Sequence, residues 1–207
     1  MAIVVVSGLP RSGTSMMMQM LEAGGMQLLT DGIRAPDEDN PRGYFEIEKV
    51  KQLRRDTSWL AAAEGKAVKI IYSSLYDLPA DRSYKLIFMR RDLQEVLASQ
   101  QQMLERSGRE GSALSAEHLA EVFAGQLQKI DRWLCGQRQI DTLHVDYAEA
   151  VVEAQTVAGR VNVFLGARLT ETAMAAAVDR GLYRKRGAAP LAEDFAGRPA
   201  VDRVAEC

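Results

Sequence analysis

Short apolar runs alternate along the chain with segments in which apolar residues recur every three or four positions. The runs Ile3–Val6, Val68–Tyr72, Leu86–Met89 and Thr142–Val145 are short and rich in β-branched or bulky apolar residues. Continuous apolar runs of this length are typical of parallel strands that are buried on both faces. The pattern therefore predicts four such strands.

The segments between these runs have helical character. Helices are expected over Thr14–Leu21, over Glu46–Ala63, from Asp92 onward, from a Ser115 cap to about Trp133, and over Val157–Leu165. Alternation of strands with helices favours an α/β fold in which helices cover both faces of a central parallel sheet. We expect three layers, with the functional site at the carboxyl ends of the strands.

Two stretches lack any periodic pattern. Thr30–Gly43 is rich in Asp, Asn, Pro and Gly, and long loops of this kind within compact domains are usually functional. From Gly187 onward the chain is rich in Ala, Gly, Pro and Asp. We therefore predict one domain over residues 1–187 and a mobile C-terminal tail over residues 188–207.

Composition narrows the classes of function. The 207 residues are 47% hydrophobic and 26% charged, as expected of one globular domain with a substantial core. A net charge of −2 provides no general basic field, so we expect no nucleic-acid partner, and any anion site must be local.

No segment reaches the roughly 18 apolar residues of a membrane span. The first strand follows Ala2 directly, so we expect no signal peptide and a cytoplasmic location. Cys135 and Cys207 give no readable metal site or disulfide, and oligomeric state is not predicted.

The segment GLPRSGTS joins the first strand to the first helix. Gly8 and Gly13 have the spacing of a phosphate-binding loop, whose backbone N–H groups and helix dipole face an anion. An ATP-type loop has lysine after the second glycine, whereas this chain has Thr14 and Ser15 there. Its cation is Arg11, which is able to bond two oxygens of a terminal group while the hydroxyls donate to an inner phosphate. The alternative is a tight turn with a solvent-facing arginine.

Pro10–Ser15, PRSGTS, after an apolar strand resembles the 5′-phosphosulfate loop of the sulfotransferases. This resemblance implies a P-loop NTPase-like sulfotransferase fold. It also implies a donor, 3′-phosphoadenosine 5′-phosphosulfate (PAPS), a product, adenosine 3′,5′-bisphosphate (PAP), and no metal. The donor-binding residues that it implies in this loop are Arg11, Ser12, Gly13, Thr14 and Ser15.

A second segment, LIFMRRDLQEVLAS at Leu86–Ser99, also resembles that family. There a strand-end arginine and a serine eight residues later bind the 3′-phosphate, which implies this role for Arg91 and Ser99. The spacing is a little over two helical turns and places Ser99 near the face on which the helix starts. Arg90 is the neighbouring alternative. Taken singly, each residue would be an ordinary surface cation or helix hydroxyl.

The resemblance continues more loosely toward the C-terminus. His144–Gly166 is similar to the family's strand, acidic-aromatic turn and short helix. Leu182–Gly187, LYRKRG, lies near the position where the family closes a basic loop over the 3′-phosphate. Arg184, Lys185 and Arg186 are therefore candidates for donor binding, or else a solvated basic face.

Sulfuryl transfer requires positioning, charge stabilisation and a base for the acceptor proton. We assign the stabilising role to Arg11, Thr14 and the loop amides. The small-molecule branch of the family uses a histidine base, but His118 lies within a predicted helix and His144 within a predicted strand, so neither is assigned.

Glu46 is our candidate base. NPRGYFE, Asn40–Glu46, resembles a segment of bacterial sulfotransferases and places Glu46 beside Tyr44 and Phe45. Partial desolvation by aromatic rings would suit a carboxylate to general-base work. The alternative is an acid that is stabilised by the dipole at a helix start.

Lys69 is the third catalytic candidate. It places a charge within an apolar strand, and sulfotransferases often carry a lysine near this point that faces the donor. Exposure at a sheet edge explains it equally well.

We therefore predict a metal-independent sulfotransferase that moves the sulfo group of PAPS to an acceptor. The acceptor is expected to be a hydroxyl of a small molecule, carbohydrate or lipid, and a peptide tyrosine is also open. One alternative is a Mg²⁺-dependent P-loop kinase that uses Ser15 and Asp146 as metal ligands, but Thr14 stands where its lysine should be. The other is a catalytically silent nucleotide-binding protein.

Overall fold

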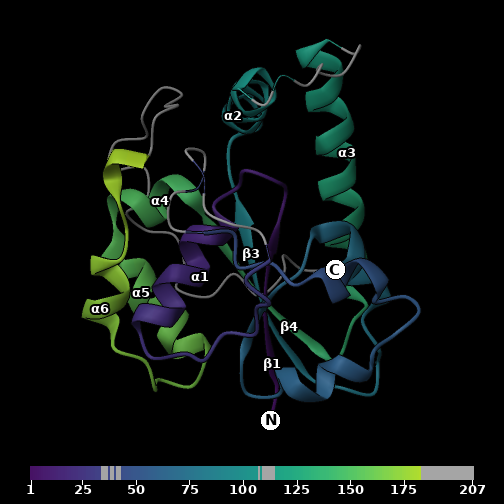
Figure 1. Ribbon diagram of the computed structural model, residues 1–207, viewed down its shortest axis with the longest axis vertical. Coiled ribbons are helices and arrows are strands. Elements are labelled where there is room, and N and C mark those ends of the chain that lie inside the picture. Colours follow the sequence, from purple (N-terminus) through teal and green to yellow (C-terminus); the bar gives the residue numbers. More distant parts are fainter. Residues whose placement is uncertain (34–36, 38–39, 41–42, 107, 109–114, 183–207) are drawn as a thin grey trace.

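Four parallel strands form the centre of the computed structural model (Figure 1). They are β1 (Ile3–Gly8), β2 (Ala67–Lys69), β3 (Tyr84–Arg90) and β4 (Ile140–Asp146), in the order β2-β1-β3-β4. The structure describes residues 1–33, 37, 40, 43–106, 108 and 115–182. The predicted tail over 188–207 and the basic triplet Arg184, Lys185 and Arg186 lie outside the described residues.

The two faces of the sheet carry separate hydrophobic clusters, because successive side chains of a strand point to opposite sides. Val4 and Val6 contribute to one cluster, whereas Ile3 and Val5 contribute to the other. The first cluster is covered by helices α1 (Thr14–Ala23), α5 (Ala154–Phe164) and α6 (Glu171–Ala176). The second is covered by three 3₁₀ segments and the end of α3 (Ala116–Cys135). The predicted three-layer α/β architecture is confirmed.

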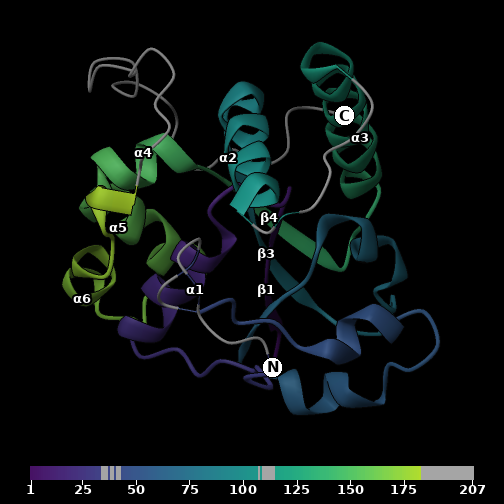
Figure 2. The same ribbon diagram turned by 45° about the horizontal axis from the view of Figure 1, so that its top comes forward.

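Helices α2 (Leu93–Arg106) and α3 pack against each other beyond the carboxyl ends of the strands (Figure 1 and Figure 2). Side-chain caps define their starts. Oδ1 of Asp92 accepts from the N–H groups of Gln94 and Glu95, and Oγ of Ser115 accepts from that of His118. None of the helices in the described part of the chain is long and apolar enough to cross a membrane.

The prediction of an α-helix over Glu46–Ala63 is wrong. The chain forms two 3₁₀ segments there, η1 (Glu48–Gln52) and η2 (Ser58–Ala63). The buried side chains Ile47, Val50 and Leu53 recur every third residue, which is the repeat of a 3₁₀ turn rather than of an α-helix.

Two further elements differ from the sequence prediction. The predicted strand Val68–Tyr72 ends at Lys69 and is followed by a 3₁₀ segment, η3 (Tyr72–Asp77). The short helix α4 (Tyr147–Val152) was not predicted as a separate element. The side chain of Asp146 caps it by accepting from the N–H group of Glu149.

The turn between β1 and α1 requires a glycine at position 13. Gly13 has φ 97°, a left-handed conformation that is costly for other residues. A Cβ atom there would lie 2.3 Å from Cδ2 of Tyr147, the first residue of α4. The loop between β1 and α1 therefore makes a sharp turn and also packs closely against α4.

We expect Gly13→Ala to lower the free energy of unfolding by about 3 kcal/mol, because left-handed strain and overpacking against Tyr147 add together. Gly25→Ala is the matched control, because Gly25 has the same φ of 97° and no atom within 4 Å of the added methyl group. It should cost only the strain, about 1 kcal/mol. Urea denaturation measures both changes, and equal losses would contradict the importance of the Tyr147 contact.

Candidate functional site

A cavity of about 580 Å³ lies where β1, β2 and β3 end, between helices α1 and α2. Eight of the residues predicted to form the site line it: Arg11, Gly13, Thr14, Ser15, Glu46, Lys69, Arg91 and Ser99. Ser12 is buried and does not line the cavity, and its Oγ has no hydrogen-bond partner among the described residues. Segments far apart in the sequence therefore share one site.

The first turn of α1 faces this cavity without a side-chain cap. Gly13 is its N-cap residue, and the first N–H groups of an α-helix have no acceptor within the helix. These donors and the helix dipole suit an anion. Thr14 and Ser15, which both carry hydroxyls, line the same wall. The loop therefore fits a phosphate or sulfate group.

The two predicted anion-binding segments are bonded to each other. Nε of Arg11 donates to Oγ of Ser99 at 3.0 Å, and Nη1 of Arg91 donates to the backbone oxygen of Arg11 at 3.0 Å. Arg11 has φ 70°, a strained conformation for a residue other than glycine. The hydrogen bond from Arg91, which follows the neighbouring strand β3, holds the backbone of Arg11 in this conformation. The second segment thus braces the first.

The side chain of Arg91 is anchored on both sides. Its Nε donates to Oε2 of Glu95 at 2.9 Å, and its guanidinium carbon lies 4.3 Å from the ring centroid of Tyr147. Burial raises the pKa of Tyr147, while the charge of Arg91 acts in the opposite direction. The ring is therefore a neutral phenol that offers its face to a cation.

Arg90, the neighbouring alternative, belongs to a different environment. Its side chain pairs with Asp131 on α3 and donates to Nδ1 of His144 at 3.1 Å. It does not line the cavity. Consecutive residues at the end of a strand point to opposite faces, so only Arg91 reaches the site.

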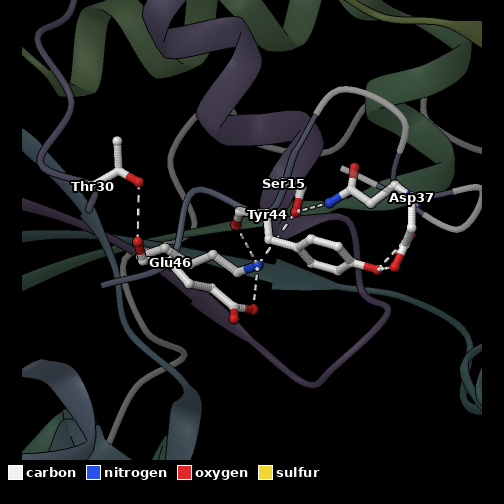
Figure 3. A network of polar contacts seen from close by, with 7 residues as sticks. Ser15, Thr30, Asp37, Tyr44 and Glu46 are labelled. Atoms are coloured by element: carbon white, nitrogen blue, oxygen red, sulfur yellow. Dashed lines mark hydrogen bonds and ion pairs between the residues drawn. The ribbon is translucent and has the colours of Figure 1, made fainter. Parts of the chain in front are cut away.

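A polar network joins Ser15 of the phosphate loop to Tyr44 and Glu46 (Figure 3), and the side chain of Lys69 connects these residues. Its Nζ lies 3.2 Å from Oγ of Ser15, 3.0 Å from the backbone oxygen of Tyr44 and 3.5 Å from Oε1 of Glu46. Its side chain is only 11% exposed, so exposure at the sheet edge does not explain this lysine. Glu46 is 38% exposed and reaches the solvent side of the pair.

Several cavity residues were not predicted from the sequence. Asn40 donates from Nδ2 to Oγ of Ser15 at 2.8 Å, and Tyr147 lies against Arg91. Gln100 contributes a buried Oε1 that has no hydrogen-bond partner in the described part of the chain. Asn40 and Tyr147 fall in segments that resemble the family, but no local signal indicated what they contact. Met103, on the same helix as Gln100, also lines the wall.

The remaining candidates lie elsewhere. His118 is exposed on α3, and His144 packs against Phe88 with 5.7 Å between ring centroids, so neither lines the cavity. Asp146, the metal ligand of the kinase alternative, caps α4. Within the described ranges, no group of three His, Cys, Asp or Glu residues is placed to hold a metal ion.

Comparison with solved structures identifies the architecture. No protein-family model matches this chain, and no curated protein is similar to it in sequence. The sulfotransferase domain from the curacin biosynthetic pathway superposes with a TM-score of 0.52 at 14% identity, over 92% of each chain. The chain has the sulfotransferase fold.

Two other structures of this fold superpose similarly. The sulfotransferase domain of the Synechococcus PCC 7002 olefin synthase gives a TM-score of 0.51 at 16% identity, over 84% of this chain and 76% of that one. Mouse sulfotransferase SULT7A1 in complex with PAP gives 0.50 at 13% identity, over 86% of this chain and 62% of that one. The sulfotransferase fold was thus predicted correctly.

We expect Glu95→Gln to lower the free energy of unfolding by about 2–3 kcal/mol, because it removes the negative charge that the buried Arg91 contacts through Nε. Both side chains of this pair are under 10% exposed, at 9% and 7%. Glu48→Gln breaks the exposed pair with Lys51, whose side chains are 53% and 70% exposed, and should change stability by less than about 0.5 kcal/mol. If urea denaturation gave the two variants equal stability, the Arg91–Glu95 pair would not support the site.

Proposed function

We propose that this protein is a PAPS-dependent sulfotransferase that transfers a sulfo group to a hydroxyl acceptor. One observation carries the proposal: a phosphate loop without the ATP-type lysine and a strand-end Arg91 with Ser99 line a single cavity. A donor with anionic groups at two ends matches two such sites. A nucleoside triphosphate, with one chain of phosphates, does not need the second.

The residues of the cavity divide between the two ends of this donor. The amides of α1 with Thr14 and Ser15 would hold the 5′ end, and Arg91 with Ser99 would hold the 3′-phosphate. Bound PAPS supplies an activated sulfo group and a bisphosphate leaving group. A protein of the same fold, mouse SULT7A1, is known in complex with PAP, which supports this choice of donor. The basic triplet Arg184, Lys185 and Arg186 is proposed as a further donor contact.

Lys69 lies between the phosphate loop and Glu46, where donor and acceptor would meet. Its ammonium group contacts Ser15 on one side and Glu46 on the other. We assign Lys69 and Arg11 to the stabilisation of negative charge during transfer. We assign Glu46 to removal of the acceptor proton, because it combines access to solvent with a place on the cavity wall.

We expect PAP to raise the melting temperature by roughly 5–10 °C at a hundredfold excess over its dissociation constant, and Mg·ATP to leave it unchanged. Arg91→Ala should weaken PAP binding about 10- to 100-fold through loss of charged hydrogen bonds. Arg90→Ala is the matched control and should bind PAP within about threefold of wild type, because Arg90 does not line the cavity. Stabilisation by Mg·ATP alone would support the kinase alternative.

We expect Glu46→Gln to slow sulfo transfer about 100-fold or more while PAP affinity stays unchanged, as for loss of a general base. The measurement is the initial rate of transfer of labelled sulfo groups from saturating PAPS to acceptors in one fixed extract. Glu48→Gln, at an exposed site two residues further along, should transfer at the wild-type rate. Binding of PAP with no transfer by wild type would instead indicate a silent nucleotide-binding protein.

A further inference from the structure

The hydroxyl of Ser15 receives two hydrogen bonds at the start of α1. Nδ2 of Asn40 donates at 2.8 Å, and Nζ of Lys69 donates at 3.2 Å (Figure 3). An ammonium group carries three donors and no acceptor, and an amide nitrogen is likewise a donor. Ser15 must therefore act as the acceptor in both bonds.

In this arrangement the Ser15 hydroxyl is left with one possible hydrogen bond, in which it is the donor. A serine hydroxyl has two acceptor lone pairs and one hydrogen to donate. Two incoming bonds occupy the lone pairs, so the hydrogen is what Ser15 offers to a ligand. Ser15 lines the cavity beside the uncapped first turn of α1. Its hydroxyl is consequently set as a donor before an anion arrives.

Asn40 is itself held in place by its surroundings. Its N–H group lies 3.0 Å from Oδ1 and 3.1 Å from the backbone oxygen of Asp37, which closes a turn. The hydroxyl of Tyr44 lies 2.7 Å from each carboxylate oxygen of Asp37. Tyr44 is buried. A chain of contacts thus runs from the buried Tyr44 through Asp37 and Asn40 to Ser15 (Figure 3).

We infer that Asn40 is a positioning residue that acts through Ser15: it orients the Ser15 hydroxyl to donate to a phosphate oxygen of the bound nucleotide. This inference rests on the proposed function. It gives Asn40, in the segment before Glu46, a part in donor binding. The segment lies 25 residues from Ser15 in sequence, so a change there is expected to act on the phosphate loop.

The test is a double-mutant cycle on PAP affinity, measured by calorimetry with wild type, Asn40→Ala, Ser15→Ala and the double variant. Each single variant should weaken PAP binding about 3- to 10-fold, the effect of one hydrogen bond. The double variant should bind no more weakly than Ser15→Ala, because Asn40 then has no hydroxyl to orient. A purely structural role would weaken binding equally in both backgrounds.

Two further variants test whether Asn40 acts by orienting the Ser15 hydroxyl. Tyr44→Phe keeps the buried ring and removes the hydroxyl that holds Asp37, so it should weaken PAP binding in the same direction and by less than Asn40→Ala. Asn40→Asp should bind more weakly than Asn40→Ala, because a carboxylate only accepts and would draw the Ser15 hydrogen away from the cavity. The control Gln101→Ala removes an exposed amide that bonds Glu105 outside the cavity and should bind as wild type.

The outcomes separate this inference from the proposed function. If wild type fails to bind PAP, the proposed function fails and the role of Asn40 fails with it. If wild type binds PAP but Asn40→Ala binds equally well, or the two substitutions weaken binding additively, only the role of Asn40 is overturned. Unchanged melting temperatures of the ligand-free variants would show that the loss of affinity does not arise from unfolding.

Discussion

The pairing of β1 with β3 is the constraint on which the rest of the site depends. Gly8 stands opposite Met89 in the parallel register, so the phosphate loop that follows β1 and the Arg91 that follows β3 leave the sheet side by side. Both segments meet at the carboxyl edge, where ligands of open α/β sheets bind. The bonds from Arg91 to the backbone of Arg11 and from Arg11 to Ser99 then join these segments into one wall. Without this neighbour relation, the two candidate anion-binding segments would not share a cavity.

Positive charge is concentrated locally in a chain whose net charge is −2. Three cations of the cavity have defined partners: Arg91 contacts Glu95, Lys69 contacts Glu46, and Arg11 contacts the neutral Ser99. Such partners orient long side chains before a ligand arrives and so reduce the entropy lost on binding. The same bonds would have to rearrange or be shared when an anionic donor enters. The cations that the proposed anion binding would use therefore lie together at this edge of the sheet.

Local patterns were sufficient for the four strands of the sheet, apart from the bounds of β2, and for the choice of the two segments that line the cavity. Apolar runs predicted the strands, glycine spacing predicted the loop, and the interval from Arg91 to Ser99 predicted a shared helix face. The prediction failed over 46–63, where apolar residues at three-residue intervals form 3₁₀ turns over the sheet instead of an α-helix. The sequence did not decide whether Lys69 is exposed at the sheet edge or belongs to the site. The burial of Lys69 depends on its contacts with the backbone of Tyr44 and with Glu46, which are distant in sequence.

By itself, the sequence determined the α/β class, the phosphate loop with arginine in place of lysine, and the candidate residues Arg91, Ser99, Glu46 and Lys69. These features depend on residue type and on short spacings, which a chain carries without being folded. Only the tertiary structure decided which of Arg90 and Arg91 faces the cavity, and that Asn40 and Lys69 converge on one hydroxyl of Ser15. Contacts between residues tens of positions apart arise from strand order and packing, and no local spacing encodes them.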